Sequence, residues 1–270
     1  MYRSQLWTVA VAISASLLSP TVRAQDKPTS LEVYPAEVHI NTMRDSQSFV
    51  VQVTYANGLT RDVTMEAKLA LANGAPVKLE GNVLRPVADG DSQLTVEFEG
   101  LAKSVPIKIE QATTDRPVSF KLDIMPIFMK SNCNTGSCHG AARGKDGFRL
   151  SLFGFDPDGD QFRIARELPG RRINLALPEE SLMMTKSVGS VPHTGGKRFD
   201  TDSEYYATML RWLQNGGNND QGEVPKVLSV ELYPPAAVLD GVDATQRLTV
   251  RAKYSDGTDR DVTNLAVFLS

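Results

Sequence analysis

The segment S-N-C-N-T-G-S-C-H-G, residues 131–140, holds both cysteines of the chain, Cys133 and Cys138, and one of its three histidines, His139. Two thiols followed directly by an imidazole can hold one haem, because the thiols form thioethers with its vinyl groups and the histidine coordinates the iron. The usual motif separates the cysteines by two residues, whereas four separate them here. The segment therefore indicates a c-type haem site with a variant spacing.

A six-coordinate haem needs a second axial ligand, and one loop near the far end of this region offers it. The loop S-V-G-S-V-P-H-T-G-G-K-R, residues 187–198, places His193 after a proline. Met183 and Met184, in P-E-E-S-L-M-M-T-K, are the alternative distal ligands. Methionine commonly fills gaps in apolar cores, so we expect both methionines in the core and His193 on the iron. Ligation by His139 and His193 predicts a low reduction potential, because an axial methionine raises it.

Two other chemistries fit the same side chains. A Cys133–Cys138 disulfide would close a short loop in an oxidising compartment, although it leaves His139 and His193 without a role. A zinc site made by all four side chains has the right number of ligands. Adjacent residues point in different directions, however, which makes shared tetrahedral ligation by Cys138 and His139 awkward.

A further acidic segment, D-P-D-G-D, partly matches a calcium-binding loop. Asp156, Asp158, Asp160 and Glu167 have the spacing of positions 1, 3, 5 and 12 of such a loop. The sixth position is Gln161 instead of the glycine that the loop requires. We therefore interpret the segment as a polar turn.

The elements that position the motif are two predicted helices. Apolar residues recur at helical spacing over 120–128, directly before Cys133. After the loops, S-E-Y-Y-A-T-M-L-R-W-L-Q-N-G-G has Ser203 as a candidate N-cap and Gly216 as a stop signal. A helix, a Cys-Cys-His motif, long loops and an aromatic closing helix follow one another in this order in class I cytochromes c.

An internal repeat flanks this region. Residues 31–64 and 230–263 match without a gap at a constant offset of 199 residues; the shared positions include Tyr34 and Tyr233, Gly58 and Gly257, Arg61 and Arg260, and Thr64 and Thr263. Asn57-Gly58 and Asp256-Gly257 predict tight hairpins, because both residues of the turn need positive φ. Alternating apolar residues on both sides of the turns predict strands of a β-sandwich.

The composition and the first residues of the chain indicate where the protein acts and which partners are excluded. A net charge of -3 and a pI near 5.7 give no basic field for nucleic acid. Residues 1–24 resemble a secretory signal peptide, with Arg3, an apolar stretch and a Val22-Arg23-Ala24 cleavage site. No stable membrane span is expected after cleavage. We therefore expect a periplasmic, secreted or cell-surface protein.

The repeated pattern Tyr-x-(Asp/Asn)-Gly-x-x-x-Asp-Val-Thr resembles the bacterial immunoglobulin-like (Ig-like) domains of group 2. The middle of the chain, from S-F-K-L-D-I-M-P to Y-Y-A-T-M-L-R-W-L-Q-N-G-G, resembles the secreted planctomycete-type cytochrome c proteins, in which such domains flank a haem domain. This resemblance implies haem c bound by Cys133, Cys138 and His139. It also implies that this chain lacks C-terminal domains usually present in the family, which agrees with a second repeat shorter than the first.

Together these patterns predict a multidomain fold. It comprises an all-β Ig-like sandwich at 25–112, a mainly α, class I cytochrome c-like haem domain at 115–217, and a partial, truncated second Ig-like domain at 226–270. We expect an extracytoplasmic electron-transfer module with haem c, an electron carrier more than an enzyme by itself. Its partner would be a redox protein or the C-terminal domains. The alternative is a cell-surface structural or adhesion protein in which Cys133 and Cys138 form only a disulfide.

Overall fold

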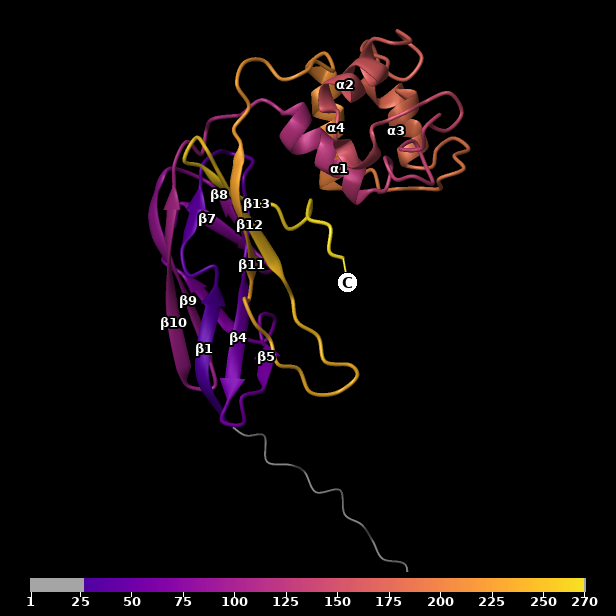
Figure 1. Cartoon of the computed structure of the whole chain (residues 1–270). Coiled ribbons are helices and arrows are strands. Elements are labelled where there is room, and N and C mark those ends of the chain that lie inside the picture. The colour runs from indigo at the N-terminus through magenta and orange to yellow at the C-terminus, as the bar shows by residue number, and fades with distance from the viewer. Residues whose placement is uncertain (1–26, 270) are drawn as a thin grey trace, which may run out of the picture.

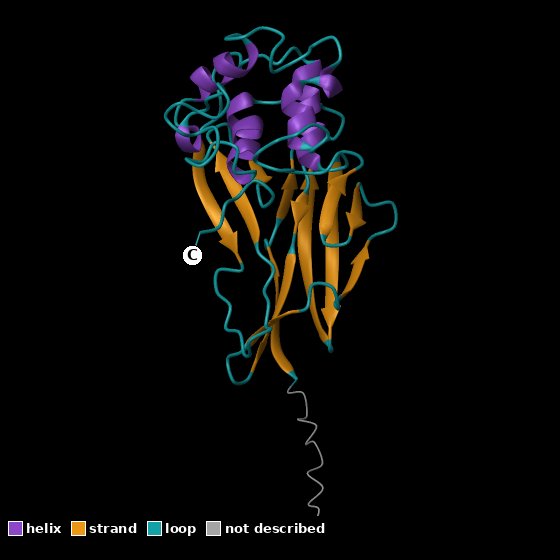
Figure 2. Ribbon diagram, turned by 90° about the vertical axis from the view of Figure 1, so that its right-hand side faces the viewer, coloured by secondary structure: helices purple, strands orange, loops and turns teal. Residues whose placement is uncertain are grey.

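The computed structural model describes residues 27–269, and the predicted signal peptide lies outside these residues. Three units follow one another along the chain: an N-terminal β unit, a helical unit and a group of C-terminal strands (Figure 1). The helices gather at one end of the long β-strands (Figure 2).

The N-terminal β unit consists of short sheets around one apolar core. Its strands are β1 (Pro28–Tyr34), β2 (Val38–Ile40), β3 (Gln47–Ser48), β4 (Val50–Tyr55), β5 (Thr60–Asp62), β6 (Lys68–Leu71), β7 (Val77–Glu80), β8 (Val83–Pro86), β9 (Gly90–Phe98) and β10 (Leu101–Ile109). They pair in the orders β1-β4-β5, β2-β10-β9-β6 and β3-β8-β7. Only β2 and β10 run parallel. Val105, Ile107 and Ile109 alternate with exposed residues along β10, so one face enters the core.

The Asp-Val-Thr part of the repeat forms side-chain hydrogen bonds that stabilise the β4–β5 hairpin. The Asp62 carboxylate accepts hydrogen bonds from the Thr64 backbone N–H at 2.9 Å and from its hydroxyl at 2.6 Å. The Thr64 hydroxyl in turn accepts the Val51 N–H of β4 at 2.9 Å. A side chain therefore satisfies a buried backbone donor at the end of the β4–β5 hairpin.

The C-terminal strands reproduce this arrangement. β11 (Val227–Tyr233), β12 (Thr249–Tyr254) and β13 (Asp259–Asp261) form an antiparallel sheet in that order. Both predicted hairpins are present, but the expected turn type is wrong. Gly58 and Gly257 each have a φ of +82°, whereas Asn57 and Asp256 do not have positive φ. The Thr263 hydroxyl accepts the Val250 N–H at 2.8 Å, as Thr64 does in the first copy.

The two copies of the repeat contact each other reciprocally. Ser48 donates its N–H to Asp261 at 2.6 Å, and Arg247 donates its N–H to Asp62 at 2.7 Å. The repeat offset of 199 residues converts each of these contacts into the other. The equivalent rings of Tyr34 and Tyr233 stack, with centroids 5.9 Å apart. The copies therefore meet as in a two-fold symmetric dimer, although they belong to one chain.

The helical unit contains short helices joined by long loops. Its elements are η1 (Phe120–Ile124), α1 (Met125–Lys130), η2 (Leu152–Gly154), α2 (Pro157–Ala165), η3 (Pro178–Glu180), α3 (Leu182–Ser187) and α4 (Glu204–Gln214). The Ser203 hydroxyl caps α4 by accepting the Tyr206 N–H at 3.2 Å. Trp212 of α4 packs on Phe120, with ring centroids 5.4 Å apart, and both side chains lie in a separate core.

The expected mainly α, class I cytochrome c-like fold class is wrong. Helices cover 18% of the described residues and strands cover 28%. The two helices predicted from periodicity are present, but α1 and α3 have only six residues each and loops fill most of the chain between α1 and α4. Strands thus outweigh helices in the structure, and the middle unit is not a class I cytochrome c fold.

Among residues 27–269, no helix has both the length and the apolar character to cross a membrane.

Candidate functional site

The Cys-Cys-His segment forms a closed loop directly after α1. The Cys133 N–H donates to the carbonyl of Phe128 at 2.8 Å, which continues the last turn of the helix. The His139 N–H donates back to the Cys133 carbonyl at 3.0 Å, and the Cys138 N–H donates to Thr135 at 3.0 Å. The four residues between the cysteines therefore form a turn, and the two ends of the motif come together.

The loop contributes both thiols to one cavity. This cavity has a volume of about 220 Å³ and is lined by Cys133, Cys138, His139, Met183, His193 and Arg198, among others. Cys133 and Cys138 are free thiols in the structure. The volume lies below the ~300–1,000 Å³ of most small-molecule sites. A large planar group held here would therefore keep part of its surface outside the cavity.

His139 and His193 both line this cavity, and in each ring Nδ1 is paired with a backbone carbonyl. Nδ1 of His139 lies 3.0 Å from the carbonyl oxygen of Phe148, and Nδ1 of His193 lies 2.9 Å from that of Gly196. A carbonyl oxygen only accepts hydrogen bonds, so each Nδ1 carries a proton and each Nε2 keeps its lone pair. A backbone carbonyl on Nδ1 is the usual way in which proteins fix the tautomer of a metal-binding histidine.

The distance between the rings suits two ligands of one ion. Their centroids lie 6.2 Å apart and the ring planes differ by 9°. Two Nε2 atoms directed at one ion between them, with metal–nitrogen bonds of about 2 Å each, would also place the ring centres about this far apart. In the described part of the chain, however, no group of three or more His, Cys, Asp or Glu side chains could hold a metal ion. Two imidazoles suit a metal whose other ligands come from a macrocycle, and the four-ligand zinc site is not assembled.

Burial and charge set the protonation of the site. Burial raises the pKa of the Cys133 thiol to about 11, although the Arg198 guanidinium opposes this effect. Arg198 also lies 3.6 Å from Sγ of Cys138. Burial lowers the pKa of His139, the Phe148 carbonyl opposes this, and the nearby His193 lowers it further. His139 is therefore held neutral, the form in which an imidazole binds a metal.

The alternative ligands are in different environments. Met184 is fully buried in the core of the helical unit. Met183 is partly buried, packs on the same core and also lines the cavity. Compared with the two methionines, His193 is the stronger candidate for the distal ligand, because its ring lies parallel to that of His139 and its Nδ1 is held by a carbonyl.

The basic residues of these loops can be recognised in the sequence, but their contacts at the site were not predicted. Arg198 follows His193 in the same loop, but only the fold brings it to Cys138. The centroid of the Phe148 ring lies 4.6 Å from that of His139 and 4.7 Å from the guanidinium of Arg172. Basic side chains outnumber acidic ones around the cavity; Lys145, Arg171, Arg172, Lys186 and Arg198 line it together with Asp146.

The acidic segment after η2 has a structural role. The Asp156 carboxylate caps α2 by accepting the Gly159 N–H at 3.1 Å. Asp160 is fully buried, accepts the Ser151 N–H at 2.6 Å and pairs with Arg163 at 2.8 Å. The segment is therefore the N-cap and first turn of helix α2, where the sequence had predicted a polar turn.

Comparison with known proteins gives no relative: no family model matches the chain, and no curated protein is similar to it.

Proposed function

We propose that the helical unit binds one haem covalently through Cys133 and Cys138, with His139 and His193 as its axial ligands, and that the chain is an electron-transfer module. The observation that carries the proposal is the pair of nearly parallel imidazoles, 6.2 Å apart, beside two free thiols in one cavity. The proposal keeps the expected cofactor, haem c, but assigns it to a fold other than that of class I cytochromes c.

The residues of the chain have separate roles in this proposal. The thiols of Cys133 and Cys138 would anchor the group, and the Nε2 atoms of His139 and His193 would coordinate the metal. The carbonyls of Phe148 and Gly196 hold the rings in the required tautomer. A haem held this way supplies reversible one-electron chemistry. Ligation by two imidazoles leaves no open position for peroxide or oxygen chemistry.

The proposed place of action is outside the cytoplasm. The predicted signal peptide would direct export, and covalent attachment of haem would be completed after export. The proposed partner is a redox protein or a further domain of the same protein.

Mass spectrometry of the chain, expressed together with haem-attachment enzymes, tests the cofactor. We expect a mass increase of one haem and sharp α and β bands after reduction. A loss of two hydrogens without haem would instead support the structural or adhesion protein with a Cys133–Cys138 disulfide.

Two variants test the distal ligand. His193→Ala is expected to remove the low-spin spectrum while haem stays attached, because only one imidazole remains. Met183→Ala serves as the matched control in the same cavity and should keep the low-spin spectrum. The reverse pattern would assign Met183 as the ligand.

A further inference from the structure

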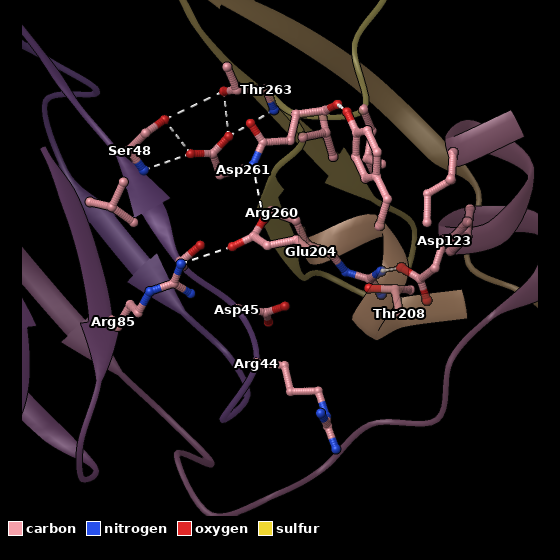
Figure 3. A pocket seen from close by; sticks show the side chains of 18 of the residues that line it. Arg44, Asp45, Ser48, Arg85, Asp123, Glu204, Thr208, Arg260, Asp261 and Thr263 are labelled. Atoms are coloured by element: carbon pink, nitrogen blue, oxygen red, sulfur yellow. Dashed lines mark hydrogen bonds and ion pairs between the residues drawn. The ribbon is translucent and has the colours of Figure 1, made fainter. Parts of the chain in front are cut away.

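A second cavity lies where the three units meet. Its volume is about 590 Å³. The β unit contributes Arg44 and Asp45, the helical unit contributes Asp123 and Thr208, and the C-terminal strands contribute Arg260; Figure 3 labels these residues. Neither cysteine and none of the three histidines lines it, so it is separate from the proposed haem site.

Most charges in this cavity are paired. Arg44 pairs with Asp115, just outside the cavity. Arg116 pairs with Asp123 at 2.7 Å, and its Nε lies 3.6 Å from Asp45. At the opposite side, beside Ser48 and Thr263 in Figure 3, Asp261 accepts hydrogen bonds from both residues. Arg260 lies 3.7 Å from Asp123 and so shares a carboxylate that Arg116 already holds.

Arg211 is the exception. Within residues 27–269, no hydrogen bond or ion pair joins its guanidinium to another side chain or to the backbone. Burial lowers the pKa of Arg211, and the positive charges of Arg44 and Arg116 lower it further. The negative charges of Asp115 and Asp123 act in the opposite direction but do not outweigh these effects. The cavity thus holds a cation whose nearest carboxylates are already bound to other arginines.

A polar group beside Arg211 also lacks a partner. Thr208 precedes Arg211 by three residues on α4, so both side chains lie on one face of the helix. In the part of the chain that the structure describes, the Thr208 hydroxyl makes no hydrogen bond. Figure 3 shows Thr208 beside Asp123, at the edge where the helical unit borders the cavity. A hydroxyl and a guanidinium on one face can together bind an oxyanion.

Apolar side chains also line the cavity. Leu122 comes from the helical unit, and Leu265 follows β13. A ligand here would therefore meet both a cation and an apolar surface. The volume lies within the range of small-molecule sites.

We propose that this cavity binds a small organic oxyanion, a carboxylate or a phosphate ester, with Arg211 and Thr208 on its anionic group and Leu122 and Leu265 against its apolar part. Because the ligand would contact all three units, its binding would also stabilise their arrangement.

Calorimetric titration of the whole chain with benzoate, phenyl phosphate and inorganic phosphate, at ionic strength matched with chloride, tests this proposal. We expect at least one aromatic anion to bind more tightly than inorganic phosphate and to raise Tm. Arg211→Gln should weaken that binding at least about tenfold, since a charge-assisted hydrogen bond is lost. Thr208→Val should weaken it less.

The controls separate binding from folding. Arg149→Gln changes an exposed arginine outside the cavity and should bind as the unchanged chain does. In chloride alone, Arg211→Gln should have an equal or higher Tm, because it removes repulsion from Arg44 and Arg116. Equal affinity in Arg211→Gln, or no binding of any of the three anions, overturns the proposal. Binding of inorganic phosphate as tight as that of the aromatic anions would restrict the ligand to the oxyanion itself.

Discussion

Gly136 and Gly140 belong to the same ten-residue segment but differ in the space around them. A Cβ atom at Gly140 would lie 2.1 Å from the carbonyl oxygen of Asn134, a backbone atom that cannot move alone. At Gly136 the nearest atom would lie 4.0 Å away. We expect Gly140→Ala to cost about 1–3 kcal/mol of stability. Gly136→Ala, its matched control, should change stability by less than about 1 kcal/mol.

Chemical denaturation of both variants measures this difference, and the reactivity of Cys133 and Cys138 toward a thiol reagent shows whether the loop opens. A Gly140→Ala variant as stable as Gly136→Ala would show that the turn between the cysteines adapts without cost.

At the level of residues, the sequence predicted which side chains lie around one cavity, and their roles there stay a prediction. The spacing of Cys133, Cys138 and His139 is local, and a local pattern can be recognised. His193 was predicted from its loop, and the structure brings it to His139. The contact of Arg198 with Cys138 depends on how two distant loops pack. No periodicity or motif encodes such a contact.

Among elements, the β4–β5 hairpin depends on the Thr64 hydroxyl. This group is buried, donates to Asp62 and accepts the Val51 N–H. Thr64→Val keeps the shape but leaves the buried Val51 N–H without its acceptor and removes one of the hydrogen bonds to Asp62. We therefore expect a loss of about 1–3 kcal/mol in the free energy of unfolding. Urea denaturation measures it. Thr95→Val, in β9 and outside this network, is the control; an equal loss in both variants would contradict the role of Thr64.

The helices show where sequence patterns stop being informative. Amphipathic spacing predicted η1–α1 and α4, because each buries one apolar face in the core of the helical unit. The order of these two helices around a Cys-Cys-His motif suggested a class I cytochrome c fold, which is wrong. That fold depends on what lies between the helices, and here the chain forms loops with the short helices α2 and α3. Short helices depend on tertiary contacts more than on their own sequence.

For the whole molecule, the repeat predicted two similar β structures but not how they meet. The reciprocal contacts join residues such as Ser48 and Asp261, which lie 213 residues apart. The C-terminal strands also reach the helical unit, where Lys130 donates to the carbonyl of Ala266 at 2.6 Å. The C-terminal copy thus contacts both other units. Since Lys130 ends α1 and lies three residues before Cys133, this contact is close to the proposed haem site.

The ionisation of Asp62 makes the stability of the contact between the two repeat copies depend on pH. Its burial acts to raise its pKa, but hydrogen bonds from Thr64 and Arg247 and the charge of Arg247 outweigh burial, so the pKa lies below its usual value. The unfolded chain then binds a proton at a higher pH than the folded chain, near pH 4. The stabilisation is therefore complete above about pH 4 and is lost as the pH falls from there toward the pKa of the folded state.

Asp62→Asn should consequently reduce stability at pH 7 by about 2 kcal/mol, and the difference from the unchanged chain should shrink below about pH 4. Urea denaturation between pH 2 and 7 measures both curves. Asp202→Asn, which changes an exposed carboxylate, should follow the unchanged chain at every pH. Because Asp62 holds the N–H of Arg247 in the C-terminal copy, the loss at pH 7 should include separation of the two copies, visible as faster hydrogen exchange of the Arg247 amide. A constant difference at all pH values would mean that the Asp62 charge does not join the copies.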